Sequence, residues 1–497
     1  MRHSGRHDLV WLGAILALAA ALRVWGLNAP LWHDEIQTLA THLNRGWASM
    51  LDSYSMNHHY LHNLLAKASI SVLGDTPWAV RLPAMLFGLG TIAAAWHLAR
   101  DIGGTRIAHV SALLLALSYH QIWFSQNARG YTALAFFSTL AMVLFLRGMR
   151  RPRPATWLGL GLCMAAAIFT HLTGAFFFVA LGLVWLGTVM VRALRGRLEP
   201  GLIGPPLTGF LLGTAVTLLL YAPLVPSLIA TVQSVSGSSA ADPMKEYQSP
   251  LWAAFEAIRT ATGNAGPLTA LAGVAVLLLS LLGWIATYRD ARLFAPTVFL
   301  HIAVTVALLM AVDMRIWPRF FFTDIAFLMI LIVSGVQLGS ALIAHLVRAP
   351  RLAGPIFTLG VIGMIGISAM LALRNYQYPK QDLKAAWNFA HQIERQGARV
   401  IAIGHAGSNF RARFGADWPV LFTDAEYHKA IAGDGPVVLV VGFPARVFRD
   451  MPQLAADAGV TPGTDICAPG HEGPVLRTLR CFPGTLGDGN VIVLSRD

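Results

Sequence analysis

Charged side chains are scarce in this sequence. Asp, Glu, Lys and Arg make up 12% of its 497 residues, whereas 55% of the residues are hydrophobic. Soluble globular domains carry about twice that charged share. The composition therefore excludes an ordinary soluble protein and predicts a polytopic α-helical membrane protein. Internal repeats are also lacking, so the chain does not read as an array of similar units.

Apolar segments long enough to cross a bilayer, which takes roughly 17–25 residues, recur along most of the chain. We expect eleven spans, at about 9–27, 78–100, 106–122, 130–147, 155–171, 174–191, 202–221, 267–287, 294–312, 319–344 and 352–373. Residues 1–27 could instead be a cleaved signal peptide, but the apolar segment continues through Arg23 and Trp25. An uncleaved first helix fits the sequence better.

The arginines indicate the orientation in the membrane. If the N-terminus is cytoplasmic, the short inner loops are rich in arginine, as in the loop with Arg147, Arg150, Arg151 and Arg153. The formal net charge is +12, but residues 380–497 carry 12 basic and 12 acidic side chains, so the whole excess lies in the membrane part. The excess therefore indicates topology and lipid headgroups, not nucleic acid.

An odd number of spans places the C-terminal segment outside. We expect two domains, a transmembrane domain over residues 1–373 with outer loops 28–77 and 222–266, and a small extracytoplasmic α/β domain over 374–497. The tail contains an amphipathic helix pattern, "DLKAAWNFAHQIERQG", and three strand-like runs, "ARVIAIG", "PVVLVVG" and "NVIVLSR". We expect the tail to be a structural lid or an acceptor-docking module.

Cysteine is nearly absent as well, with three residues in the chain. Cys163 falls inside an expected span and reads as a small apolar filler. Cys467 and Cys481 both fall in the outer tail, where a disulfide could persist, although the sequence does not establish one.

Two adjacent carboxylates, Asp34 and Glu35, follow the first span directly in "LWHDEIQTL". They could simply cap a helix, because acids in a first turn are favoured by the helix dipole. Neighbouring helical residues do not share a face. If one carboxylate faces a cavity, the other therefore supports it or binds something else.

Histidines follow in "NHHYLHNLL", where His58 and His62 are four residues apart and would share a helical face. That spacing can bind zinc, but ordinary loop histidines explain it better. A site formed by Glu35 and one histidine stays open. No cofactor is assigned, and the sequence leaves open whether a divalent metal is needed.

Arginines occur near the outer ends of several spans, at Arg81, Arg129, Arg315 and Arg319. Each alone could be an anchor whose charged end reaches the headgroup layer. Taken together with Asp34 and Glu35, they occur at one depth on one face of the membrane. Guanidinium groups bind phosphate through charge-assisted bidentate hydrogen bonds, and a carboxylate can remove a proton from a hydroxyl. The pattern indicates a site where a lipid phosphate leaves and an alcohol attacks.

At these residues the chain resembles the integral-membrane GT-C type glycosyltransferases, specifically the bacterial family 39-like set related to protein O-mannosyltransferases and to the aminoarabinose transferase that modifies lipid A. The resemblance rests on "LWHDEIQTL", "NHHYLHNLL", "GDTPWAVRLPAMLFGLGTIAAAWHLAR" and "SQNARGYTALAFFSTLAMVLFLRG", and more loosely on "PRFFFTDIAFLMIL". It covers about residues 10–150 and 315–345 and leaves the tail outside.

The resemblance implies an inverting transfer from a sugar on a polyprenyl phosphate to an acceptor hydroxyl on a glycolipid, glycan or protein. Asp34 would be the general base and Glu35 would orient the acceptor. The donor phosphate would be bound by Arg81, Arg129 and Arg319, and the secondary substrate contacts would be His58, His59 and Tyr131. The expected location is the bacterial cytoplasmic (inner) membrane. The sequence contains no Gly-rich phosphate loop, which fits a lipid-linked donor rather than a nucleotide sugar.

Two departures from the family pattern concern the acceptor side. The family often has H-P-P-L-Y where this chain reads His58-His59-Tyr60-Leu61-His62, and it often has an acid where this chain has Asn127. A transporter or flippase of a lipid-linked glycan is the main alternative, although transporters place charged groups nearer the middle of the membrane. A non-catalytic scaffold is a third reading.

Overall fold

The computed structural model describes residues 2–237, 248–261, 266, 268–433, 435–461 and 463–496. The chain forms two compact units. The first unit comprises Met1–Leu27 and Gly46–Ala372, and the second comprises Asn28–Arg45 and Leu373–Asp497. Most of "SVSGSSAADP", which the sequence marks as the flexible centre of loop 222–266, lies outside the described residues.

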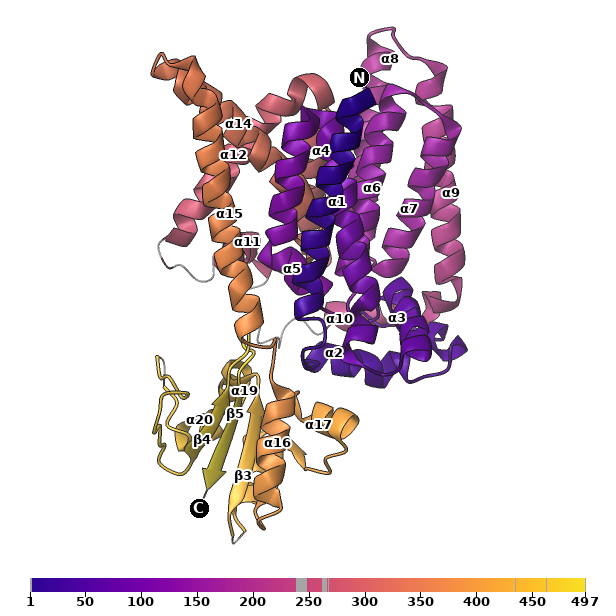
Figure 1. Cartoon of the computed structure of the whole chain (residues 1–497). Helices are drawn as coiled ribbons and strands as arrows, with labels where there is room; N and C mark the ends of the chain where they lie inside the picture. The colour runs from indigo at the N-terminus through magenta and orange to yellow at the C-terminus, as the bar shows by residue number, and fades with distance from the viewer. Residues whose placement is uncertain are drawn as a thin grey trace. The chain divides into compact units, whose positions relative to one another are not determined.

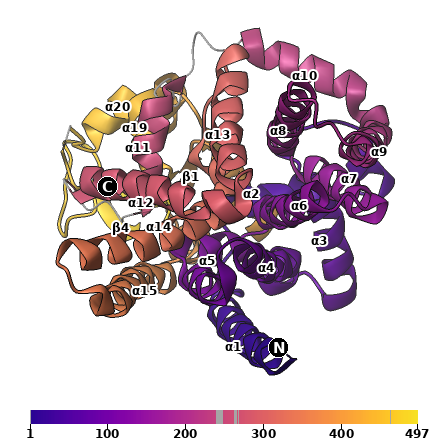
Figure 2. The same ribbon diagram turned by 90° about the horizontal axis from the view of Figure 1, so that it is seen from above.

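Long helices build the first unit (Figures 1 and 2). In the described chain, nine helices are long and apolar enough to cross a membrane, and the shorter α7 is also apolar, which confirms the predicted helical membrane class. The helices are α1 (Arg2–Trp25), α3 (Tyr60–Leu73), α4 (Pro77–Leu117), α5 (Tyr119–Ser125), α6 (Tyr131–Arg150), α7 (Pro154–Thr170), α8 (Gly174–Leu194), α9 (Gly204–Tyr221), α10 (Val225–Gly237), α11 (Pro250–Ala261), α12 (Leu268–Ala291), α13 (Phe294–Ala311), α14 (Asp324–Leu346) and α15 (Ala353–Gln377).

Helix α4 contains the predicted span 78–100 and most of the predicted span 106–122. Its backbone leaves helical geometry at Gly104, where φ is 80°. The Trp96 and His109 rings lie 5.9 Å apart, whereas 13 residues of straight helix would separate them by about 20 Å. The chain therefore reverses at Gly104. The predicted span 78–100 lies in the first arm of α4, and the predicted span 106–122 covers the second arm and the first residues of α5. Their separate crossing of the bilayer, and the total of eleven spans, stay predictions.

A buried arginine joins α1 to the end of α4. Arg23 is fully buried. Its Nη1 donates to the carbonyls of Ala19 at 3.0 Å and Ala116 at 3.2 Å, and its Nε donates to Ser125 Oγ at 3.1 Å. The last carbonyls of a helix lack intrahelical donors and carry a partial negative charge. Arg23 therefore caps the second arm of α4 and fixes the position of α5.

Glycines bring the backbones of α12 and α14 into direct contact. A Cβ added to Gly283 would lie 2.0 Å from the carbonyl oxygen of Leu331. A Cβ added to Gly335 would lie 2.0 Å from the carbonyl oxygen of Leu279. Lipid tails are as apolar as side chains, so close backbone packing is a main source of attraction between membrane helices. These two glycines let α12 and α14 pack closely.

Helices α7 and α9 cross in the same way. A Cβ on Gly161 would lie 2.3 Å from the Gly209 carbonyl oxygen, and one on Gly209 would lie 2.4 Å from the Trp157 carbonyl oxygen. Gly209 and Gly213 form a small-xxx-small pattern on α9. The first unit thus contains two helix pairs in backbone contact.

The second unit contains a five-stranded mixed sheet in the order β2-β1-β3-β5-β4. Its strands are β1 (Arg399–Ile403), β2 (Val420–Leu421), β3 (Val437–Gly442), β4 (Arg477–Phe482) and β5 (Val491–Arg496). Strands β2, β1 and β3 are parallel, and β5 is antiparallel to both of its neighbours. Every residue of β3 is buried, as expected for a central strand covered on both faces.

The described residues of the tail also form five helices, namely α16 (Leu383–Glu394), α17 (Gly407–Phe414), α18 (Asp424–Ile431), α19 (Pro444–Asp450) and α20 (Pro452–Asp457). The predicted amphipathic helix is α16, and its N-cap residue Asp382 accepts the Ala385 N–H at 3.0 Å. The three predicted strands are β1, β3 and β5, which confirms a small α/β domain. Cys467 and Cys481 form a disulfide.

We expect Gly335→Ala to lower the thermal stability of the detergent-purified protein, because the new methyl group would force α12 and α14 apart. Overpacking of this kind costs about 1–3 kcal/mol. Gly363→Ala is the matched control, because a Cβ there meets nothing within 4 Å among the described residues. Differential scanning fluorimetry of both variants checks the prediction, and equal melting temperatures would contradict it.

Candidate functional site

Three elements of the first unit bring aromatic rings together. His59, just before α3, is fully buried. Its ring centroid lies 4.9 Å from that of Tyr131 at the start of α6, and 4.8 Å from that of His171 at the end of α7. Gly130 permits this approach, since a Cβ there would lie 3.0 Å from His59 Nδ1 and 2.5 Å from Thr170 Cγ2. We call His59, Tyr131, His171, Arg129 and Arg319 the histidine–arginine cluster.

Two arginines from distant parts of the sequence reach this cluster. Arg129, in the turn between α5 and α6, is buried and donates from Nη1 to the Asn57 backbone carbonyl at 3.1 Å and from Nη2 to the Asn57 side chain. Arg319 lies in the 3₁₀ turn η7 (Pro318–Phe321), and its guanidinium stands 4.8 Å over the Trp317 ring. The structure thus brings together two of the three arginines that the sequence predicts as phosphate ligands.

Burial and positive charge keep the cluster's imidazoles neutral. His59 and His171 both lie in loops outside the membrane-spanning helices. Burial lowers the pKa of His59 well below its usual range. The charge of Arg129 adds to this effect, followed by the neighbouring histidines and Arg319. Burial, followed by Arg129 and Arg319, lowers the pKa of His171 to about 3. The guanidinium groups stay protonated in proteins. The cluster is therefore positively charged through its arginines alone, which suits an anion.

The hydrogen bonds of His171 fix its tautomer. The Thr173 N–H donates to His171 Nδ1 at 3.3 Å, and the Thr173 hydroxyl lies 2.7 Å from the same nitrogen. Nδ1 is therefore the acceptor, and the ring proton is on Nε2. For His59, no hydrogen-bond partner is found for either buried ring nitrogen among the described residues. Buried polar atoms of this kind normally have a partner, so a polar ligand would complete the cluster.

The remaining predicted histidine packs separately. The His58 ring stacks on Tyr60 with centroids 4.0 Å apart, and its Nδ1 lies 3.2 Å from Asn63 Nδ2. In the described part of the chain, no group of three or more His, Cys, Asp or Glu side chains could hold a metal ion. The four-residue spacing of His58 and His62 therefore does not by itself produce a metal centre there.

The two carboxylates lie in the second unit, on α2 (His33–Thr38). Glu35 is fully buried, and its Oε2 accepts the backbone N–H of Trp32 at 3.3 Å. This bond closes the first turn of the helix. Asp34 is half-buried, and its carboxylate makes no hydrogen bond or ion pair with any described residue. Glu35 thus stabilises the helix that carries Asp34.

Arg81 is fully buried near the start of α4, and its Nη1 donates to the Leu27 carbonyl at 2.9 Å. This bond anchors the chain at the residue where it leaves the first unit. Arg81 and Arg129 belong to the first unit and Asp34 to the second, and the convergence of the three stays a prediction.

Sequence reasoning missed His171 and Asn57. His171 occurs in "FTHLTG", directly after an apolar helix. Its signal is the same as that of Arg129, a polar side chain at the outer end of a span. Asn57 was indistinguishable from any exposed loop residue, because its role depends on a contact 72 residues away.

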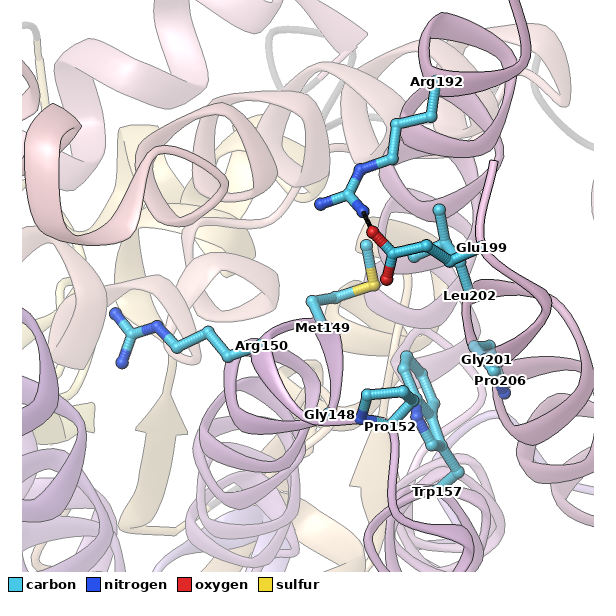
Figure 3. A pocket seen from close by; sticks show the side chains of 10 residues that line it. All are labelled: Gly148, Met149, Arg150, Pro152, Trp157, Arg192, Glu199, Gly201, Leu202 and Pro206. Carbon is cyan, nitrogen blue, oxygen red and sulfur yellow. Dashed lines mark hydrogen bonds and ion pairs between the residues drawn. The ribbon is translucent and has the colours of Figure 1, made fainter. Parts of the chain in front are cut away.

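A separate cavity of about 200 Å³ lies at the other ends of α6 and α7 (Figure 3). Its lining includes Arg150, Trp157 and Arg192, and Arg192 Nη1 pairs with Glu199 Oε1 at 3.3 Å. Helix α6 has 20 residues, which correspond to about 30 Å. The cavity and the histidine–arginine cluster are therefore on opposite sides of the first unit.

Comparisons with known proteins agree with this architecture. The family model for dolichyl-phosphate-mannose-protein mannosyltransferase matches residues 57–200. No curated protein sequence matches the chain. The crystal structure of ArnT from Cupriavidus metallidurans in the apo state superposes with a TM-score of 0.54 at 14% identity, covering 100% of this chain and 98% of that one.

Two further solved structures share the fold. ArnT from the same organism bound to undecaprenyl phosphate has a TM-score of 0.52 at 14% identity, covering 98% of this chain and 97% of that one. The oligosaccharyltransferase AglB from Archaeoglobus fulgidus, with an inhibitory peptide and a dolichol-phosphate, has a TM-score of 0.50 at 14% identity, covering 81% of this chain and 63% of that one. The predicted GT-C fold and resemblance are confirmed, and the ArnT match extends over the tail that the sequence resemblance left outside.

We expect His171→Gln to make the protein less sensitive to mild acid. In the unfolded chain His171 binds a proton below about pH 6.5, whereas in the folded protein its pKa of about 3 keeps it neutral. The unfolded state then binds more protons, so this histidine lowers stability as the pH falls from about 6.5 towards 3.

The measurement is the fall in melting temperature between pH 7.5 and 5.0, which should be smaller in His171→Gln than in the wild type. His7→Gln, at an exposed position, is the control and should keep the wild-type fall. An unaltered fall in His171→Gln would contradict the neutral assignment.

Proposed function

We propose that the protein transfers a sugar from a polyprenyl-phosphate donor to an acceptor hydroxyl at the outer face of the membrane, with inversion at the anomeric carbon. The observation that carries the proposal is the histidine–arginine cluster, in which the charges of Arg129 and Arg319 act on two neutral imidazoles in a GT-C fold. ArnT and AglB, which share the fold, were solved with undecaprenyl phosphate and dolichol-phosphate, and this supports a lipid phosphate as the ligand.

In this proposal Arg129 and Arg319 bind the donor phosphate. Both lie close enough to His59 and His171 to lower their pKa values, so they act on one region. The Nε2–H of neutral His171 can donate a hydrogen bond without adding charge. As the bond between the sugar and the phosphate breaks, negative charge grows on the leaving phosphate, and the fixed guanidinium groups stabilise it. Arg81 keeps its predicted assignment as a further phosphate ligand.

Asp34 is the proposed general base, with Glu35 supporting its helix. The acceptor oxygen attacks the anomeric carbon on the face opposite the phosphate, its proton passes to the Asp34 carboxylate, and the lipid phosphate leaves. A single displacement of this kind inverts the configuration. The half-buried Asp34 carboxylate, with no ion pair among the described residues, is available for proton transfer.

We propose that the N-terminus is cytoplasmic and the tail extracytoplasmic, in a bacterial inner membrane. The arginine-rich loops support this orientation, as does the Cys467–Cys481 disulfide, because disulfides persist outside the reducing cytosol. Both the lipid-linked donor and the acceptor would then be on the outer side.

One observation favours the flippase alternative. His301 Nδ1 and Asp324 Oδ1 lie 2.8 Å apart, and both side chains are buried between α13 and α14. His301 is near the middle of α13, and ionisable groups at that depth often mark transport pathways. The two functions are separable by measuring label transfer and lipid movement in the same vesicles.

We expect Asp34→Asn to lower the rate of label transfer from a radiolabelled polyprenyl-phosphate sugar to membrane-extract acceptors by about 10²–10⁴-fold, because the amide cannot accept the proton. Donor binding should stay close to that of the wild type. Transbilayer movement of the donor without label transfer would instead establish a flippase, and full activity of Asp34→Asn would refute the base assignment.

For the phosphate role, Arg129→Ala and Arg319→Ala should each weaken donor binding by about tenfold or more, because each removes a charge-assisted hydrogen bond. Arg129→Lys should lose less than Arg129→Ala, since it keeps the charge. Arg315→Ala is the comparison for Arg319→Ala, because Arg315 is a neighbouring arginine outside the histidine–arginine cluster. Donor affinity equal to that of the wild type in all four variants would contradict the assignment.

A further inference from the structure

Residues 28–45, which the sequence assigns to a membrane loop, group with the C-terminal domain. One buried amide links two residues of α2 to the tail. Asn409 of α17 is fully buried, its Oδ1 accepts from Gln37 Nε2 at 2.7 Å, and its Nδ2 lies 2.7 Å from His33 Nδ1. Because Gln37 uses the amide oxygen, the amide N–H is the donor to His33. One side chain thus bonds two residues of α2.

The spacing of these contacts determines which face of α2 is held. His33 and Gln37 are four residues apart and lie on one helical face. Asp34 is between them in sequence and lies about 100° around the helix from His33. The Asn409 bonds therefore fix the rotation of α2 without using the Asp34 carboxylate.

Two more residues of the tail hold His33. The fully buried Gln381 accepts the His33 backbone N–H at 3.4 Å. The His33 ring packs against the Phe443 ring with centroids 5.1 Å apart and planes at 89°. Phe443 adopts a left-handed backbone conformation with φ of 57°, which is uncommon for a bulky residue and persists where the surroundings enforce it. His33 is thus held at its backbone and at its ring.

The place where α2 docks is the edge of the sheet that usually binds ligands. Strand β1 leads through α17 to β2 on one side, whereas β3 leads through α19 towards the other side. Open α/β sheets bind ligands at such a switch point, beyond the carboxyl ends of the strands. Asn409 and Phe443 follow β1 and β3 there, and α2 occupies the position.

We propose that the C-terminal domain is a positioning domain for Asp34, and that Asn409 is its principal positioning residue. The inference rests on the proposed function, in which Asp34 is the general base. The domain's switch point holds the chain's own α2 in place of a separate ligand. A displacement of a catalytic group by about 1 Å can cost about a hundredfold in rate, so rigid support of α2 has a direct kinetic consequence.

The test uses the full-length protein in vesicles with the radiolabelled donor. Asn409→Ala and Gln37→Ala both remove the hydrogen bond between these two side chains. Asn409→Ala also removes the bond to His33, and Gln37→Ala also removes the bond to Ser408 Oγ at 2.9 Å. Each should lower kcat about tenfold or more, while KM for the donor stays within about twofold, because the phosphate-binding arginines are in the other unit. The double variant should lose less than the product of the two single losses, because the two substitutions share the hydrogen bond between Gln37 and Asn409.

Tyr427→Phe is the matched control. It removes a buried hydrogen bond of the same domain, from Tyr427 Oη to Asp457 Oδ2 at 2.8 Å, at a site apart from α2. It should leave kcat within about twofold while lowering the stability of the domain. If Tyr427→Phe lowers kcat as much as Asn409→Ala does, general loosening explains the effect and the positioning role is overturned.

Hydrogen exchange of the peptide covering residues 28–45 supplies a readout that does not depend on activity. It should speed up in Asn409→Ala and Gln37→Ala and stay unaltered in Tyr427→Phe. Faster exchange with wild-type kcat would overturn the inference. An active Asp34→Asn enzyme would instead refute the proposed function, so the two failures are distinguishable.

Discussion

Burial of His59 and His171, reinforced by the permanent charge of the Arg129 guanidinium, lowers the pKa of both imidazoles and keeps them neutral. The rest of the site depends on this constraint. The Asn57 contacts hold the guanidinium in place, and Gly130 leaves room for the rings to approach. The outcome is a region whose charge is fixed by arginine and whose imidazoles supply uncharged polar groups.

The permanent charge of arginine also governs where Arg23 and Arg81 lie in the first unit. Arg23 is accommodated because the carbonyls at the end of α4 need donors, and Arg81 bonds the carbonyl of Leu27. In apolar surroundings an unsatisfied polar group is costly, so each arginine is placed where backbone oxygens are available. Buried arginine therefore serves as a connector between segments of the first unit.

Much of the architecture could be predicted from the sequence, because long apolar segments and buried strands carry strong local signals. The sequence correctly indicated the helical membrane class, α16 and the strands β1, β3 and β5. It missed β4, whose residues alternate irregularly in burial, and the two-residue β2. Their pairing depends on strands distant in sequence, which no local pattern reports.

The candidate site was predictable only in part. Arg129 and Arg319 stand out because charge at the end of an apolar segment is costly and therefore informative. His171 carries the same signal but was overlooked. Asn57 and Asn409 carry no such signal, since their contacts are made only by folding. The grouping of α2 with the tail was also out of reach, because the hydrogen bond from Gln37 to Asn409 spans 372 residues.

The glycine contacts between α12 and α14, and between α7 and α9, limit where a lipid chain can pass between the helices. Where two backbones touch, as at Gly283 and Gly335, no gap remains that is wide enough for a hydrocarbon chain. An isoprenoid tail therefore cannot pass between the two helices at either crossing. Any lateral entrance for a long-chain substrate must therefore lie away from these two helix crossings.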